Sequence, residues 1–278
     1  MDFGWLESLL FGITTGLTEI LPVSVQAHDR ILLKFMGRAD SPALMRLLVH
    51  LSVFAAIFIS CQPHILKMVR AKKMSRIPKR KRKRPLDTLS LMDLSLLVTM
   101  LLPVVLMLLI WKQAEKLAAN TIIMATFLFV NGLILYIPQF LPSSNKDCRS
   151  LSRVEGLLMG LGGAMFAVPG LSGMGAALSI ASVTGVERKY GLKMILLLQL
   201  GVLAGKSVYD LLDLISAGVG KMGVASVLSG LLAAAAAFLA AFLAVKWLRH
   251  LAEEKGFSSF AYYSWGMALF TFILTLMA

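Results

Sequence analysis

The sequence predicts an all-α integral membrane protein, with six transmembrane helices and two re-entrant helical hairpins arranged as inverted-topology repeats. Three observations lead to this prediction. The chain is 58% hydrophobic with a mean hydropathy of +0.78, which is more apolar than a soluble domain. Six segments are long and apolar enough to cross a bilayer. Two further apolar regions are interrupted repeatedly by glycine and proline.

A helix needs about 20 apolar residues to cross a bilayer. Segments that meet this requirement lie at 43–61, 91–111, 118–141, 190–212, 222–245 and 258–277. The first residues show no basic stretch and no small-residue cleavage site, so we expect no removable signal peptide. We therefore expect residues 1–278 to form a single membrane domain, multi-pass in the bacterial plasma (inner) membrane.

The two interrupted regions are 3–35 and 153–184. The first contains the polar stretch "TEILPVSVQAHDR" at 18–30, and the second contains seven glycines and a proline between 156 and 175. Such a density of glycine and proline destabilises a continuous helix. Broken helices at membrane depth are tolerated where they line a cavity enclosed by protein. Both regions are therefore predicted to be re-entrant hairpins.

The two hairpins resemble each other at an offset of 148 positions. Gly12 then matches Gly160, and Ser24 matches Ser172. Each hairpin is followed by three spans, and an odd number of spans inverts the second copy in the membrane. The predicted repeats cover about 3–141 and about 153–277. Interrupted segments at corresponding places in two halves indicate a site near the middle of the bilayer.

Ten of the fifteen residues from Arg70 to Arg84 are Lys or Arg, within a net charge of +13. A basic run of this kind binds nucleic acid in some proteins. Because it lies between two spans, the positive-inside rule favours a basic cytoplasmic loop at 62–90, and we expect no nucleic-acid partner. With this loop inside, hairpin 3–35 opens outward and hairpin 153–184 opens inward.

Candidate catalytic and phosphate-binding groups gather at the two predicted hairpin tips. Glu19 can hold a metal ion or act as an acid or base, and His28 can exchange a proton near neutral pH. Backbone N–H groups of a glycine-rich turn that opens a helix bind phosphate-type anions. The expected catalytic residues are Glu19, Ser24 and His28, and we expect Glu19 and His28 to lie within one cavity with Ser172. The expected phosphate-binding residues are Gln26, Gly170, Ser172, Gly173 and Gly175.

Structural roles compete with these assignments. Serines at a hairpin tip also satisfy broken backbone, which applies to Ser24 and to its counterpart in the second hairpin. His50 either lines the cavity or is a satisfied packing residue. Lys206 is expected to extend its amine towards the membrane surface. Asp210 and Asp213 are expected at the interface.

The motifs resemble those of a known family. "GITTGLTEILPVSVQAH" resembles the first signature of the undecaprenyl-diphosphate phosphatase family of bacitracin-resistance membrane proteins. "PGLSGMGAA" resembles its second signature, and "FSSFAYYSWGMALF" is similar to its C-terminal helix. The resemblance implies a polyprenyl diphosphate or monophosphate as substrate, with undecaprenyl lipid as the default, in lipid-carrier recycling for peptidoglycan synthesis. It also implies a divalent cation, Mg²⁺ or Ca²⁺, and leaves a homodimer open.

The sequence departs from the family pattern where the chemistry should lie. Thr15 stands at the first Glu or Gln of the pattern, Val25 at its second serine, and Gly173 at its arginine; Met174 and Ala177 replace hydroxyl residues. One carboxylate alone holds a divalent cation poorly, and valine cannot attack phosphorus. Without arginine, the charge on the phosphoryl oxygens lacks its forked partner.

Two functions therefore remain open at this stage. The chain is either a diphosphatase with a rearranged or weakened catalytic set, or a non-catalytic relative that binds or translocates the lipid phosphate. The resemblance favours the first. The lost side chains favour the second, and inverted repeats with broken helices are the architecture of alternating-access transporters.

Overall fold

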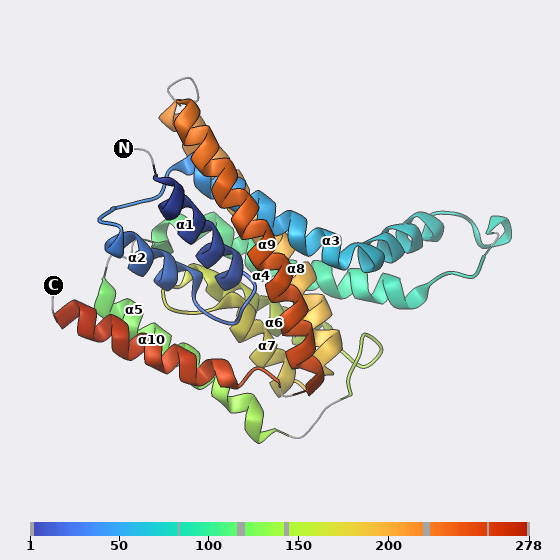
Figure 1. Ribbon diagram of the computed structural model, residues 1–278. Coiled ribbons are helices and arrows are strands. Elements are labelled where there is room, and N and C mark those ends of the chain that lie inside the picture. Colours follow the sequence, from blue (N-terminus) through green and yellow to red (C-terminus); the bar gives the residue numbers. More distant parts are fainter. Residues whose placement is uncertain are drawn as a thin grey trace.

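A computed structural model describes residues 3–82, 84–115, 120–141, 145–218, 223–254 and 256–276 (Figure 1). The described residues are helical apart from turns, loops and one isolated bridge between Lys146 and Val186. The helices are α1 (Trp5–Thr18), α2 (Val25–Phe35), α3 (Ala43–Ser75), η1 (Lys79–Lys81), α4 (Thr88–Glu115), α5 (Thr121–Tyr136), η3 (Ile137–Phe140), α6 (Arg153–Ala164), η4 (Met165–Ala167), α7 (Gly173–Val183), α8 (Arg188–Ala217), α9 (Val224–Glu254) and α10 (Ser259–Leu276).

Six helices in the described part of the chain are long and apolar enough to cross a membrane: α3, α4, α5 with η3, α8, α9 and α10. This confirms the predicted number of spans. The predicted loop at 62–90 needs correction, because α3 continues as a helix to Ser75. Its last turns are rich in lysine, arginine, methionine and alanine, which favour helix. In Figure 1, α3 and α4 project beyond the other helices. The Lys- and Arg-rich connection between Ser75 and Thr88, which we call the basic segment, lies at the tip of this projection.

The two interrupted regions form the helix pairs α1–α2 and α6–α7. At 1.5 Å per residue, the 12 residues of α6 and the 11 of α7 span about 18 Å or less, too short for the ~30 Å apolar core of a bilayer. Serines begin the second arm of each pair. The Ser24 Oγ accepts from the backbone N–H of Ala27, and the Ser172 Oγ accepts from that of Gly175. Both pairs fit the predicted re-entrant hairpins.

Helices from the two halves pack in an exchanged pattern. The first hairpin packs through α1 against α9, and the second packs through α6 against α4. Likewise α3 contacts α9 and α8 contacts α4, while α3 and α8 also contact each other. Gly12 and Gly160 allow the two hairpin contacts, because a Cβ at either would collide with a backbone carbonyl of α9 or α4. This exchange is what two inverted repeats would produce.

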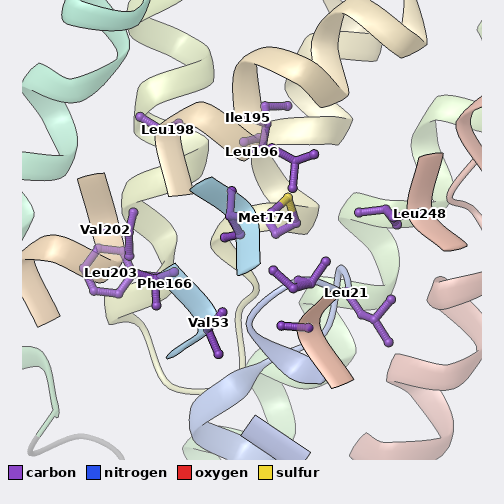
Figure 2. Packing of buried hydrophobic residues seen from close by; sticks show 14 of the residues in the cluster. Leu21, Val53, Phe166, Met174, Ile195, Leu196, Leu198, Val202, Leu203 and Leu248 are labelled. Atoms are coloured by element: carbon purple, nitrogen blue, oxygen red, sulfur yellow. The ribbon is translucent and has the colours of Figure 1, made fainter. Parts of the chain in front are cut away.

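Both hairpin tips enter one buried apolar cluster (Figure 2). Leu21 comes from the first tip, and Phe166 and Met174 come from the second. Around them pack residues of α3, α8 and α9: Val53, Ile195, Leu196, Leu198, Val202, Leu203 and Leu248. Within a membrane, van der Waals packing of this kind holds helices together. The cluster fixes the two tips against each other and leaves the polar groups beside it.

Candidate functional site

The tips of the two hairpins meet around Glu19 and Ser172. These two residues line one small cavity of about 10 Å³, together with Thr18, Val23, Val25, Phe166, Leu171, Gly173, Met174 and Gln199. A Cβ added to Gly175 would lie 3.2 Å from Pro22, so the tips are in direct contact. A cavity of this size holds at most about one water molecule. The predicted proximity of Glu19 and Ser172 is therefore present, but the space between them does not accommodate a phosphate.

Two backbone amides of the second tip, those of Ser172 and Gly175, already have side-chain partners. The Ser172 N–H donates to Asn131 Oδ1 at 2.9 Å, and the Gly175 N–H donates to the Ser172 hydroxyl at 3.0 Å. Asn131 in turn donates to the Ser264 hydroxyl at 2.9 Å. Ser172 thus caps α7 and is 3% exposed. The tip has the residues of an anion site, but these two amides are used for folding.

The glycines at this tip serve the turn and the close packing. Gly170 has φ of +92°, a conformation that favours glycine. A Cβ at Gly173 would collide with the Gly163 carbonyl and press on Phe166. The position where the family pattern places arginine therefore has no room for a longer side chain.

Three side chains donate to the Glu19 carboxylate or contact it. The Lys206 amine donates to Oε1 at 2.6 Å, the Gln199 amide donates to Oε2 at 2.8 Å, and the His50 Nε2 lies 3.4 Å from Oε1. Glu19 and Lys206 are both buried. Charges buried this deeply persist only when they are paired. Lys206 is therefore a buried partner of Glu19, which corrects the prediction that it extends to the membrane surface.

The expected divalent cation does not fit these donors. The ammonium group of Lys206 stands directly beside the carboxylate that would bind the metal. Within the described residues, no group of three His, Cys, Asp or Glu side chains is arranged to hold a metal ion. Mg²⁺ and Ca²⁺ bind through oxygen ligands that include at least one carboxylate as a rule, and the positive charge of Lys206 repels a cation at the Glu19 carboxylate. Glu19 in this arrangement is therefore not free to hold a divalent cation.

A chain of ion pairs continues from Glu19 along α3 and α8. The His50 Nδ1 lies 2.6 Å from Asp210 Oδ2, and the Arg46 Nε donates to Asp210 Oδ1 at 3.1 Å. Arg46 also donates to Asp213 at 3.2 Å, and Lys112 donates to the same carboxylate at 2.6 Å. Asp210 is 3% exposed, so it is a buried member of the network, where we had expected an interfacial group.

Spacing along α8 is the sequence signal that identifies this network. Gln199, Lys206, Asp210 and Asp213 follow one another at intervals of seven, four and three residues. These intervals place all four side chains on one face of a helix. Each residue by itself has an ordinary explanation, and only the common face shows that they act together.

A cavity of about 320 Å³, which we call the outer cavity, adjoins the network. Its lining residues come from the first hairpin, from the loop between α2 and α3, and from α3, α4 and α8: Val25, Gln26, Asp29, Arg30, Asp40, Arg46, His50, Trp111, Lys112, Lys206, Tyr209, Asp210 and Asp213. In the predicted orientation it lies in the outer half of the membrane. Four Lys or Arg side chains and four Asp side chains line it, so the charges nearly balance.

Helix α2 presents two polar side chains to the outer cavity, Gln26 and Arg30; the Trp111 Nε1 of α4, which also lines the cavity, is buried without a hydrogen-bond partner. The side-chain nitrogen and oxygen of Gln26 are buried and have no hydrogen-bond partner. Arg30, one turn further on, donates to the Ala39 carbonyl at 3.4 Å and pairs with no carboxylate in the described part of the chain. Asp29 accepts a 3.1 Å hydrogen bond from the Thr15 hydroxyl. Thr15, at the lost carboxylate position of the family pattern, thus orients a different carboxylate.

Ser24 and His28 do not reach the outer cavity. Ser24 is fully buried and caps α2. The His28 Nδ1 lies 2.6 Å from the Ser24 carbonyl, and its Nε2 lies 2.7 Å from the Tyr263 hydroxyl. His28 lines a separate, mainly apolar pocket of about 460 Å³ between the first hairpin, α9 and α10. The structure therefore separates His28 from Glu19 and Ser172, contrary to the shared site that we predicted.

Comparison with known proteins establishes the family. The model of the family described as "Bacitracin resistance protein BacA" matches residues 8–270. The chain belongs to the BacA family. Among relatives named undecaprenyl-diphosphatase, that of Methanobrevibacter smithii is 30% identical over 96% of both chains. That of Pseudarthrobacter chlorophenolicus is 28% identical over 97% of this chain and 96% of its own.

BacA membership confirms the resemblance drawn from the two signatures and the C-terminal helix. The family and the six apolar helices together make the chain a multi-pass protein of the bacterial inner membrane. The two interrupted helix pairs fit this family.

Proposed function

We propose that this BacA-family chain binds the phosphorylated headgroup of undecaprenyl diphosphate or undecaprenyl phosphate in the outer cavity, and that it hydrolyses the diphosphate slowly or not at all. The substrate class comes from the names of its relatives. The observation that carries the proposal is the state of Glu19, whose carboxylate is bound by Lys206 and Gln199. This carboxylate is committed to an internal ion pair.

Headgroup recognition rests on α2 in this proposal. Arg30 and Gln26 line the outer cavity and have donors to offer. A guanidinium group binds phosphate oxygens through two parallel hydrogen bonds. The nearly balanced charge of the rest of the cavity gives little other attraction to an anion, so these two side chains supply most of the binding.

Residual hydrolysis in this proposal uses Asp29. A water molecule attacks the terminal phosphorus and transfers its proton to the Asp29 carboxylate, while the bond between that phosphorus and the bridging oxygen breaks. The products are inorganic phosphate and undecaprenyl phosphate. Val25 lines the cavity where the family pattern has serine, so no hydroxyl at that position can attack phosphorus. Phosphoryl transfer depends on positioning and charge stabilisation, and Gly173 leaves one of the usual cations missing.

The test is equilibrium binding of radiolabelled undecaprenyl phosphate to the purified protein. Arg30→Gln should weaken binding about tenfold or more, because a hydrogen bond to a charged group contributes about 1.5–3 kcal/mol. Lys34→Gln is the matched control, since Lys34 is exposed one turn further along α2 and does not line the cavity. Equal effects of both substitutions, or no saturable binding by the parent protein, would contradict the proposal.

Translocation of the lipid phosphate is the second candidate. It is favoured by the packed hairpin tips, which close the inner side of the outer cavity. It ranks second because the other half lacks a matching polar site. At the offset of 148, Gln26 matches Met174, Asp29 matches Ala177 and Arg30 matches Leu178, all buried and apolar. Transfer of a fluorescent polyprenyl phosphate across proteoliposomes, scored with a membrane-impermeant quencher, measures this activity directly.

A further inference from the structure

A further hollow lies along α3, α4 and α8, away from the outer cavity. It is a groove of about 570 Å³ between α3, α4 and α8, at the end of the helices that carries the basic segment. We call it the basic groove. No residue of the outer cavity contributes to it.

One face of α3 forms the floor of the basic groove, and its side chains change from apolar to cationic towards the end of the helix. Ile65 and Val69 are followed by Lys72 and Arg76, at intervals of four, three and four residues. These intervals keep the side chains on one helical face. The facing walls are apolar, with Leu97 from α4 and Leu200 from α8. The groove is therefore apolar along most of its length and cationic at one end.

The cations at that end are open to a ligand. Lys72, Lys73 and Arg76 are exposed, and none pairs with a carboxylate in the described part of the chain. From Phe54 at the apolar end to Lys72, α3 rises about 27 Å. One leaflet of the bilayer core is about half of 30 Å. An extended acyl chain thus fits in the groove while its headgroup stays at the cations.

We propose that the basic groove is a specific site for an anionic phospholipid of the leaflet that faces the basic segment. One acyl chain lies against α3, α4 and α8, and the phosphate contacts Lys72, Lys73 and Arg76. Basic pockets between transmembrane helices on the cytoplasmic side recognise anionic lipid headgroups in this way. The proposal does not depend on the function proposed for the outer cavity, because the two sites share no residue.

The first test compares two triple variants of equal charge in nanodiscs that contain phosphatidylglycerol and phosphatidylcholine. Lipids retained by the protein are counted by native mass spectrometry. In the variant K72Q/K73Q/R76Q, the ratio of retained phosphatidylglycerol to retained phosphatidylcholine should fall about a hundredfold, since each cation contributes about fivefold. The control variant K79Q/R80Q/K81Q removes the same charge from η1, outside the groove, and should change the preference less than about threefold.

The second test blocks the apolar part of the groove without changing charge. Leu97→Trp should reduce phosphatidylglycerol retention, whereas Val98→Trp should not, because Val98 is 55% exposed on the same helix and does not line the groove. Equal losses in the two triple variants, or equal effects of the two tryptophans, would overturn the proposal. Displacement of phosphatidylglycerol by an equimolar amount of undecaprenyl phosphate would also overturn it, because the groove would then be a carrier-lipid site.

Discussion

Removing the Lys206 amine should destabilise the protein strongly, because it leaves the Glu19 carboxylate buried without its main partner. The side chains of Lys206 and Glu19 are 5% and 0% exposed, and their charged atoms lie 2.6 Å apart. Solvent screening is therefore small. Breaking a buried pair by removing one partner costs about 3–5 kcal/mol. We expect Lys206→Met to lower the free energy of unfolding by roughly that amount, measured by reversible unfolding in mixed micelles.

A control on the same helix separates this effect from the general cost of losing a lysine. Lys189 pairs with Glu253 at 3.2 Å, but both side chains are more than half exposed. Lys189→Met should therefore cost no more than about 1 kcal/mol. In addition, Glu19→Gln combined with Lys206→Met should be less destabilising than the sum of the two single effects. The reasoning is refuted if Lys206→Met costs no more than Lys189→Met, or if the two effects add to within about 0.5 kcal/mol.

Three further predictions concern the hairpins, the topology and the candidate base. Gly173→Ala should destabilise the protein by about 1–3 kcal/mol through overpacking, whereas Gly266→Ala, with open space around it, should be neutral or stabilising when both are compared by thermal unfolding. A cysteine placed at Ser75 should not react with an impermeant reagent added to intact cells, and strong labelling would reverse the assigned orientation. Thr15→Val should remove the hydrogen bond that orients Asp29, and it should lower any phosphate release about as much as Asp29→Asn does. If Asp29→Asn lowers phosphate release and Thr15→Val does not, Thr15 does not position the base.

The spans and the interrupted pairs were predictable because they depend on hydropathy and on glycine and proline. The extension of α3 to Ser75 was not. A run of Lys and Arg indicates a side of the membrane, but the same residues are good helix formers. Hydropathy cannot distinguish a basic helix from a basic loop.

The pairing of Glu19 with Lys206 could not be predicted from the sequence either. Lys206 lies 187 positions away along the chain, and span order does not specify which helix faces meet. The common face of α8 was visible in the spacing, but the choice of Glu19 as partner depends on how α8 packs beside the first tip. By contrast, the capping roles of Ser24 and Ser172 were among the alternatives at the outset, because a broken helix must satisfy its first backbone N–H groups.

The repair suggested by the family pattern meets a steric obstacle. Restoring the missing arginine at Gly173 would place its Cβ against the Gly163 carbonyl and Phe166. The close packing of the second tip thus requires glycine at this position. An arginine at this position would need a different arrangement of this tip.

The most direct measurement is phosphate release from undecaprenyl diphosphate by the purified protein, with Mg²⁺ and with a chelator. The committed carboxylate of Glu19, the absence of a hydroxyl at Val25 and the packed Gly173 together predict turnover well below ~1 per second, equal under both conditions. Turnover within the ordinary range of enzymes, ~1–1000 per second, or strong activation by Mg²⁺, would contradict the account.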